Sequence, residues 1–499
     1  MPEPTIPPLG DLAPDAESAE VVGALIDSVD RLGAGLDARA IDAAHALPEG
    51  LLSRLAELGL FGLSLPEEHG GFGFSLWECA SVTAALARHD RSVATTVGLH
   101  LGLGTRGLVA FGSPEQHARW VPPLASGEMI AAFAATEPGA GSDLGAIATR
   151  AVETDGMFRV DGSKIFVTNG GLAGLFTIAA STPGLGGARR GQGLLLLHVD
   201  DPGVEVGAEE VKLGLRGSST TSLSLDGVVV PRDRLLGEPG KGAAHLSHVL
   251  AWGRSLMAAG CCGTGHAALD AMQRHCASRV QFHRPIEKLP VVAAQLADAR
   301  ALLFSMEALV RHTAADPEAL PTRSLAAKVH CSEGAWELAD RAVQLHGGSG
   351  YIEETGVALL LRDARITRIF EGANDVLRVH MGLLATMGVP RQDLAPLGSL
   401  GLAADALAAE VDRVAADLKR RKGARLGGAH VELHALGSLV ALVSSVDAAV
   451  LRAAHEQTSE ARNLAVRWLD QATARCLAPL RALSPDRVGI QSVPTELHP

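Results

Sequence analysis

The sequence predicts a mainly α-helical protein with a central β domain and a helical C-terminal extension. Helical periodicity of the apolar residues runs over about residues 19–131, gives way to short strand-like runs near residue 132, and returns at about residue 245. An Ala-rich helical segment follows Pro390. The composition agrees with this fold class, because 47% of the 499 residues are hydrophobic and only 3% are aromatic.

Five segments follow from these changes of pattern and from the Pro and Gly residues between them. Residues 1–14 are expected to be a Pro-rich disordered lead. The other expected segments are an N-terminal α-helical domain (15–131), a middle β domain (132–240), a C-terminal helical bundle domain (241–390) and a helical extension (391–499). A chain of this length can bury more than one core.

Turn and glycine signals refine this picture in two places. In the β domain, strands are expected at residues 158–168, 194–199 and 221–230, and we interpret Asp161-Gly162 as a turn within the first. In the first helical domain, residues 102–107 match the dinucleotide-binding spacing G-x-G-x-x-G. No strand precedes them, so we interpret these glycines as a site of close helix packing.

Charge and cysteine content exclude several classes of function. The formal net charge of −12 argues against a nucleic-acid surface, and six Cys without C-x-x-C spacing indicate neither a zinc site nor a disulfide scaffold. We expect no metal. The longest apolar run, residues 436–446, is too short to cross a bilayer. The first twenty residues contain five acidic residues and no basic one, so we expect no targeting signal and a cytoplasmic location.

A glutamate stands at a predicted break between two helices. In the stretch R-I-F-E-G-A-N-D (residues 368–375), Glu371 lies between apolar residues and a glycine, and Asn374 and Asp375 are good N-cap residues for the next helix. Burial among apolar side chains would raise the pKa of such a glutamate from about 4.3 towards about 6–7, which suits a general base. On these residues alone, a solvated loop glutamate remains the alternative.

Two Gly-rich loops could bind a cofactor. Residues 135–143 (A-T-E-P-G-A-G-S-D) offer hydroxyls and backbone N–H groups suited to a flavin ring edge or a phosphate. Residues 344–351 (Q-L-H-G-G-S-G-Y) form a second loop between predicted helices. Each loop alone is weak support, because an ordinary Gly/Ser turn has the same composition.

In this order and at this spacing, the motifs resemble the acyl-CoA dehydrogenase family over about residues 20–388. Residues 136–143 match its T-E-P-G-A-G-S-D signature without a change, and residues 344–351 match its Q-x-x-G-G-x-G-aromatic signature. R-D-A-R-I (362–366) and F-E-G (370–372) stand where the family has R-D-A-K-I and its catalytic E-G. Within the family, the chain most resembles the very-long-chain enzymes, with which it shares the Gly253-Arg254 pair and an added C-terminal region.

The resemblance implies a fold and a reaction. The fold would be an α-helical domain, a β-barrel domain and a four-helix bundle domain, followed by the extension. The activity would be FAD-dependent dehydrogenation of fatty acyl-CoA to trans-2-enoyl-CoA in β-oxidation, with electrons passed to electron-transfer flavoprotein. Glu371 would remove the α-proton of the thioester while the β-hydrogen leaves as hydride.

The resemblance also assigns the cofactor and substrate residues. Those matched to the flavin are Phe133, Ala135, Thr136, Gly141, Ser142, Phe166 and Thr168. Arg279, Gln281 and Phe282 would reach the FAD diphosphate of a neighbouring subunit, and Gln344, Gly347, Gly348, Ala373 and Asp375 would line the adenosine side. Ser142, Arg254 and Gly372 would contact the substrate.

Three positions depart from the usual pattern of the family. Phe166 stands where Trp is usual, Ala373 replaces the usual Thr after E-G, and Ala251 stands where many relatives carry Asp or Asn beside the CoA arm. Some relatives place their catalytic Glu at the position of Gly253, and glycine cannot serve as a base. Glu371 is therefore the only candidate.

Two alternatives in function remain open at this point. An acyl-CoA oxidase would use the same site but pass electrons to O₂. A non-catalytic relative would act as a scaffold or assembly factor, for which Ala373 and Ala251 leave some room.

The extension has helical segments with broad apolar faces, at residues 402–418, 433–451 and 460–480. The resemblance to the very-long-chain subgroup implies that these segments cover their own bundle and that the protein is a homodimer, with a homotetramer as the alternative. We interpret the basic cluster at residues 419–422, with Arg425, as cations at a helix C-terminus, in preference to a membrane-surface patch.

Overall fold

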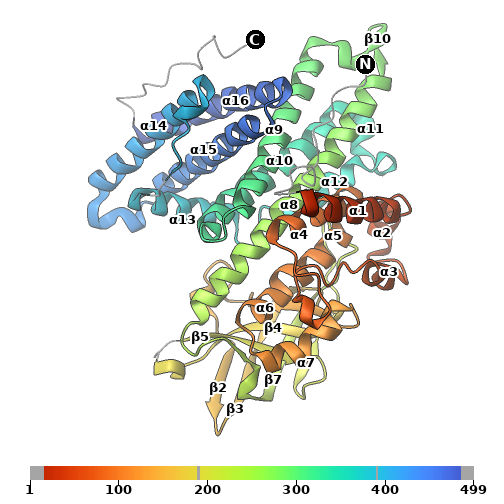
Figure 1. Cartoon of the computed structure of the whole chain (residues 1–499), viewed down its shortest axis with the longest axis vertical. Helices are drawn as coiled ribbons and strands as arrows, with labels where there is room; N and C mark the ends of the chain where they lie inside the picture. The colour runs from red at the N-terminus through yellow and green to blue at the C-terminus, as the bar shows by residue number, and fades with distance from the viewer. Residues whose placement is uncertain (1–15, 188–190, 389–390, 485–499) are drawn as a thin grey trace. The chain divides into compact units, whose positions relative to one another are not determined.

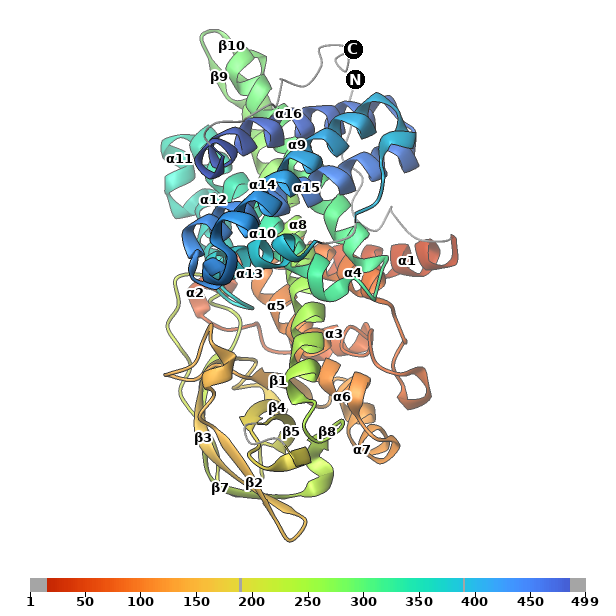
Figure 2. The same ribbon diagram turned by 90° about the vertical axis from the view of Figure 1, so that its left-hand side faces the viewer.

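The computed structural model describes residues 16–187, 191–388 and 391–484 (Figures 1 and 2). Two compact units divide the chain between Gly263 and Thr264. The long helix α8 (Gly242–Ser278) contributes residues to both. The main features of the predicted fold class are confirmed, with helices first, a central sheet, and helices again to the end of the described chain.

The first unit begins with short helices around a well-packed core. They are α1 (Ala16–Gly33), α2 (Ala38–Ala44), α3 (Leu51–Glu57), α4 (Leu76–His89), α5 (Arg91–Leu99), a π-helical turn (His100–Gly104), α6 (Thr105–Phe111) and α7 (Pro114–Ala125). The break expected at Ser113-Pro114 is the start of α7. There Ser113 and Gln116 form a capping box, and Pro114 occupies the first helical position, where no backbone donor is lost.

The glycines at residues 102–107 lie where helices and a strand approach closely. A Cβ atom added to Gly104 would lie 2.9 Å from the Cβ of Ala131, and one added to Gly102 would lie 3.5 Å from the Cα of Gly253. The prediction of close packing, in place of nucleotide binding, is confirmed.

An eight-stranded sheet follows in the same unit. Its strands are β1 (Ile130–Ala134), β2 (Arg150–Thr154), β3 (Met157–Thr168), β4 (Ala173–Ser181), β5 (Gln192–His198), β6 (Val204–Val206), β7 (Thr220–Pro231) and β8 (Leu235–Leu236). The order is β6-β7-β3-β2-β4-β5-β8, and β1 pairs in parallel with β4. One apolar core joins the sheet to α6, α7 and α8, and a second lies between the strands.

The turn expected at Asp161-Gly162 is wrong. These residues lie inside the continuous strand β3, at a shift in its register with β7. The chain turns instead at Asp155-Gly156, with φ of 51° and 76°, which is the two-residue hairpin conformation between β2 and β3. Gly162 has a different role, because an added Cβ would lie 2.7 Å from the Cα of Thr149.

The second unit is helical. Besides the end of α8 it contains α9 (Pro290–Ala314), α10 (Leu320–His346), α11 (Gly348–Tyr351), α12 (Val357–Ile366), α13 (Asn374–Met387), α14 (Ser399–Lys422), α15 (His430–Glu456) and α16 (Ser459–Leu483). A small hairpin, β9 (Val280–Gln281) and β10 (Arg284–Pro285), connects α8 to α9.

The extension packs on the bundle of its own chain, as the resemblance implied. Helix α15 contacts α9, α10 and α13, and α16 contacts α9 (Figures 1 and 2). Ion pairs reinforce this contact, with Arg475 on α16 making two bonds of 2.8 and 2.9 Å to Glu337 on α10. Arg467 bonds Asp298 on α9 at 2.8 Å.

Helix α15 is longer than its apolar run suggested. It continues past Asp447 to Glu456, and among the described residues it alone is long and apolar enough to cross a membrane by length and composition. The expectation that this segment is too short to cross a bilayer is therefore wrong as to the length of the helix. In this unit α15 packs against five other helices, and 61% of its most apolar window is buried, which is typical of a core helix.

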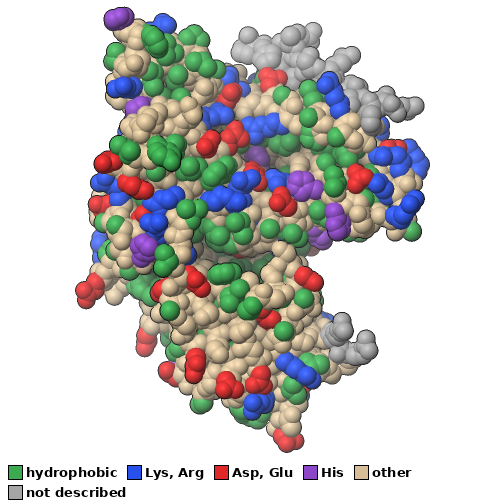
Figure 3. Space-filling view, turned by 180° about the vertical axis from the view of Figure 1, so that it is seen from behind, with side chains coloured by type: hydrophobic (Ala, Val, Ile, Leu, Met, Phe, Trp, Pro, Cys, Tyr) green, Lys and Arg blue, Asp and Glu red, His purple; other side chains and the backbone are tan. Residues whose placement is uncertain are grey.

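The basic cluster occupies the last turn of α14. Arg420 and Arg421 pair with Asp417 of the same helix, and Lys422 pairs with Glu432 on α15. Basic and acidic side chains are also interspersed on the face drawn in Figure 3. These pairings favour the interpretation as helix-terminal cations.

Candidate functional site

Glu371 lies at a break between two helices, as predicted. It is half-buried between α12 and α13, and its backbone is left-handed, with φ of 55°. Gly372 follows with φ of 100°. A left-handed non-glycine residue costs about 1–3 kcal/mol and persists only where its surroundings hold it.

A buried lysine holds the loop that carries Glu371. The ammonium group of Lys328, on α10, donates to the carbonyl oxygen of Gly372 at 2.8 Å and to Oδ1 of Asn374 at 2.7 Å. The side chain of Lys328 is inaccessible to solvent. The backbone N–H of Asn374 closes the loop onto the carbonyl of Arg368 at 3.0 Å.

The expectation that Asn374 or Asp375 caps α13 is wrong. The N-cap residue is Ala373, and α13 begins at Asn374. The amide of Asn374 donates instead to Ser332 at 2.9 Å and to Glu333 at 2.8 Å. The side chain of Asn374, which the local sequence predicted to be a helix cap, therefore bonds residues of α10 instead.

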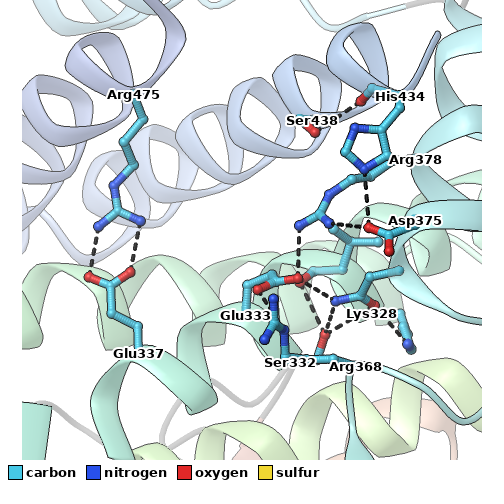
Figure 4. A network of polar contacts seen from close by, with 12 residues as sticks. Lys328, Ser332, Glu333, Glu337, Arg368, Asp375, Arg378, His434, Ser438 and Arg475 are labelled. Atoms are coloured by element: carbon cyan, nitrogen blue, oxygen red, sulfur yellow. Dashed lines mark hydrogen bonds and ion pairs between the residues drawn. The ribbon is translucent and has the colours of Figure 1, made fainter. Parts of the chain in front are cut away.

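Glu333 is the centre of this polar network (Figure 4). It forms ion pairs with Arg368 and Arg378, both at 2.8 Å, and accepts a hydrogen bond from the amide of Asn374. Burial raises the pKa of Glu333, but the amide of Asn374 and the two guanidinium groups outweigh burial and hold this pKa below its ordinary value. The network fixes both ends of the loop around Glu371 to one carboxylate.

Sequence reasoning missed Lys328 and Glu333. The available signal was a single lysine within the apolar helical stretch S-L-A-A-K-V-H-C (324–331), with a glutamate five residues later. A charged residue on a buried helical face requires a partner. Its partner, the carbonyl of Gly372, is 44 residues away in the sequence and left no local trace.

A second buried charge pair holds the loop at residues 135–143. Glu137 accepts from Lys164 at 2.7 Å, from the N–H of Ala148 at 2.7 Å and from that of Thr149 at 2.9 Å. Lys164 also donates to the carbonyl of Ala179 at 2.7 Å. Burial lowers the pKa of Lys164, and the pair is almost completely excluded from solvent. Sequence reasoning missed both residues.

The residues predicted to surround the flavin ring all lie in the first unit. Phe133 and Ala135 are buried in its apolar core, whereas Thr136 and Thr168 are half-buried. Phe166 is 62% exposed and left-handed (φ 56°), at an irregularity between β3 and β7 that turns it outward. The N–H of Ile165, the residue before Phe166, donates to the carbonyl of Thr136 at 3.0 Å. The Gly-rich loop therefore begins beside Phe166.

The tip of that loop is open. Gly141 and Ser142 are exposed. The backbone N–H groups of Gly139, Gly141 and Ser142 donate to no other residue in the part of the chain that the structure describes. Such a row of N–H groups can bind a phosphate or a polar ring edge.

The other predicted cofactor residues lie in the second unit. Arg279, Gln281 and Phe282 are exposed on the β9–β10 hairpin, and Phe282 is 80% exposed with φ of 50°. Gln344, Gly347 and Gly348 are exposed at the end of α10, and Ala373 is half-buried. Asp375 pairs with His434 and Arg378, both at 3.1 Å, and the bond to His434 holds the pKa of this carboxyl below its ordinary value.

The predicted substrate residues are divided between the units. Ser142 and the half-buried Arg254, on α8, belong to the first unit, and Gly372 belongs to the second. Ala251 is completely buried in α8. No group of three or more potential metal ligands occurs among the described residues.

Comparison with known proteins gives three consecutive family matches. The models of the N-terminal, middle and C-terminal domains of acyl-CoA dehydrogenases match residues 33–128, 132–228 and 240–383. The chain is 37% identical over 340 residues to an acyl-CoA dehydrogenase of Bacillus subtilis (strain 168), covering 66% of this chain and 88% of that protein.

The extension finds counterparts in longer relatives. The chain is 33% identical over 447 residues to the mitochondrial very long-chain specific acyl-CoA dehydrogenase of Mus musculus, covering 86% of this chain and 64% of that protein. It thus spans about 64% of the length of such relatives. The crystal structure of an acyl-CoA dehydrogenase complexed with FAD from Bacillus anthracis superposes with a TM-score of 0.81 at 27% identity, covering 94% of this chain and 88% of that one.

Proposed function

The chain belongs to the acyl-CoA dehydrogenase family, and on that premise we propose that it is an FAD-dependent enzyme that dehydrogenates fatty acyl-CoA thioesters to trans-2-enoyl-CoA. The observation that carries this proposal is the placement of Glu371. It is half-buried in a left-handed loop that Lys328 and Glu333 hold from below. A carboxylate held in this way is suited to general-base catalysis.

The residues of this chain fit FAD. The open N–H groups of Gly139, Gly141 and Ser142 offer donors to a flavin ring and a phosphate, as do the hydroxyls of Thr136, Ser142 and Thr168. The exposed guanidinium of Arg279 offers a fork for a diphosphate. An added Cβ on Gly347 or Gly348 would meet no atom within 4 Å, so this loop leaves room for a nucleotide. When bound, FAD supplies the acceptor for two electrons.

Glu371 then acts as the base that takes the α-proton of the thioester. This proton is acidic enough only if donors held in place stabilise the enolate charge in a site that excludes water. The loop can hold the carboxylate over the substrate because Lys328 fixes Gly372, the residue next to the base. Ser142, Arg254 and Gly372 are the residues assigned to substrate contact.

We assign the electrons to electron-transfer flavoprotein and the pathway to fatty-acid β-oxidation. The active form is proposed to be a homodimer in which the exposed β9–β10 hairpin, with Arg279, Gln281 and Phe282, reaches the FAD of the other subunit. The cytoplasmic location stays a prediction.

The variant Glu371→Gln tests the proposal. Gln preserves size and hydrogen bonding but cannot take a proton, so turnover should fall by at least about 10³-fold while bound flavin stays at the wild-type level. Glu318→Gln changes an exposed carboxylate of the same unit and should leave turnover unchanged. Retention of a tenth of the activity by Glu371→Gln would exclude Glu371 as the base.

The acceptor and the substrate are tested on wild-type enzyme. A series of acyl-CoA chain lengths, scored by kcat/KM, identifies the preferred substrate. Turnover with electron-transfer flavoprotein under anaerobic conditions is expected to exceed turnover with O₂ alone. The reverse result would identify an oxidase, and protein purified without flavin would favour a scaffold.

A further inference from the structure

We propose that helix α15 of the C-terminal extension positions the catalytic loop, by fixing α13 in register beneath Glu371. This inference rests on the proposed function, because it gives Glu371 its catalytic role. It goes beyond that function by making the extension part of the catalytic apparatus. The positioning residues are Gly382 and Gly437, which make the helix crossing, and Arg378, which links it to the loop.

The two helices cross backbone to backbone. A Cβ atom added to Gly437 on α15 would lie 1.8 Å from the carbonyl oxygen of Arg378 on α13. Reciprocally, a Cβ added to Gly382 on α13 would lie 2.0 Å from the carbonyl oxygen of Leu433 on α15. No side chain separates the helices at these points, so neither helix can slide or rotate without a steric clash.

This crossing begins in the second turn of the helix that follows the catalytic loop. Helix α13 begins at Asn374, three residues after Glu371, and the carbonyl that meets Gly437 belongs to Arg378 in the second turn. Three residues cannot absorb a large shift of the helix. A displacement of α13 would therefore move Gly372 and Glu371, or break their bonds to Lys328.

Polar contacts link the same turn to the loop (Figure 4). Arg378 bonds Glu333 at 2.8 Å and Asp375 at 3.1 Å, and Asp375 bonds His434 on α15 at 3.1 Å. The Asp375–His434 pair is largely exposed and contributes little by itself. The half-buried ion pairs of Glu333 and the buried bonds of Lys328 transmit the position of α13 to the loop, and the glycine crossing sets that position.

The extension offers a matched control for the glycine contact. A Cβ added to Gly401 on α14 would lie 1.9 Å from the carbonyl oxygen of Leu394, a clash similar to that of 1.8 Å at Gly437. Leu394 belongs to the segment that precedes the 3₁₀ turn Ala395–Leu397, and not to α13. Gly401→Ala therefore perturbs the extension by the same chemistry without touching the catalytic loop.

The experiment compares Gly437→Ala, Gly382→Ala and Gly401→Ala in the full chain. We expect the first two to lower kcat by about tenfold to a hundredfold in protein that remains folded, because small displacements of a reacting group have effects of this size. The kinetic isotope effect with α-deuterated acyl-CoA should rise, because proton removal becomes slower. Amide hydrogen exchange should accelerate across residues 368–377.

Gly401→Ala should lower thermal stability and leave kcat, the isotope effect and exchange at residues 368–377 at their wild-type values. The proposal is overturned if folded Gly437→Ala keeps the wild-type kcat, isotope effect and exchange at residues 368–377. It is also overturned if Gly401→Ala changes these three quantities as Gly437→Ala does.

A variant without a steric clash covers the case in which Gly437→Ala fails to fold. Arg378→Met removes the link to Glu333 and should lower kcat about threefold or more, with faster exchange at residues 368–377. Wild-type kcat and exchange in this variant would overturn the proposal. Wild-type protein without any dehydrogenase activity would contradict the proposed function instead, and the exchange measurement would still decide whether α15 holds the loop.

Discussion

Three of the predicted site residues have a strained, left-handed backbone. Among the described residues nine non-glycine residues have positive φ, and three of them are Phe166, Phe282 and Glu371. Strain of about 1–3 kcal/mol at each position has to be offset by neighbouring contacts. For Glu371 the structure identifies these contacts as the bonds around Lys328 and Glu333.

Lys328→Met is the sharpest single test of these contacts. It keeps the size of the side chain but leaves the carbonyl of Gly372 and the amide oxygen of Asn374 without their donor. We expect a loss of about 2–4 kcal/mol in the free energy of unfolding, measured in urea, and at least a tenfold lower kcat. Lys288→Met, at an exposed lysine that pairs with Glu287, should change stability by less than about 0.5 kcal/mol. Equal effects of the two variants would contradict the assigned role of Lys328.

At the scale of helices and strands, the same short sequence pattern can serve either a turn or a close packing contact. Asp155-Gly156 and Asp161-Gly162 have the same composition, but only the first makes the turn. The second glycine is required by the close approach of Thr149. Likewise Asp90 is the N-cap residue of α5, and its side chain accepts from the N–H of Val93 at 2.8 Å as in an ordinary helix cap, yet this aspartate is buried.

The cap of α5 predicts a pH dependence of stability. Burial raises the pKa of Asp90 to about 6, although backbone N–H groups oppose the rise. Between about pH 4 and pH 6 the folded state therefore holds the proton more tightly than the unfolded state. The free energy of unfolding should fall by about 2–3 kcal/mol as the pH rises through this window.

Asn also caps helices but does not ionise, so Asp90→Asn should remove this component. Urea unfolding at pH 4.5 and pH 7 measures it as the difference between wild type and variant. A wild type that gained stability relative to Asp90→Asn on going to pH 7 would contradict the dominance of burial.

At the scale of the whole molecule, the extension and the hairpin make separate predictions. The extension covers the bundle of its own chain, so light scattering of the full chain should give twice the 51.6 kDa of one subunit. The physical reason is that an apolar face already buried by α14, α15 and α16 is no longer available to a second dimer. A tetramer would contradict this prediction.

The hairpin predicts complementation between subunits. Arg279 is exposed on its own unit and is proposed to hold the FAD of the partner subunit. Mixing Glu371→Gln subunits with Arg279→Ala subunits should restore part of the activity, because one site of a hybrid dimer then has both groups. Hybrids that form but stay inactive, with Arg279→Ala alone impaired, would place Arg279 in the site of its own chain.

The sequence by itself determined the order of helices and strands, the family, and the break that carries Glu371. Helices, strands and the break show in the local sequence, because the period of apolar residues and the positions of Gly and Pro depend on short-range geometry. The family shows in motifs such as T-E-P-G-A-G-S-D. The broad apolar faces of the extension predicted that it is buried, but not which residues make the contact.

Only the tertiary structure decided what holds the site. The bond from Lys328 to Gly372 spans 44 residues, the pair Glu137–Lys164 spans 27, and the contact between Gly437 and Arg378 joins different helices. Asn374 shows the same competition, because a local pattern made it a cap and long-range partners use it elsewhere. Contacts between distant residues depend on how whole helices pack, and the period of apolar residues shows which face of a helix packs but not which residue it meets.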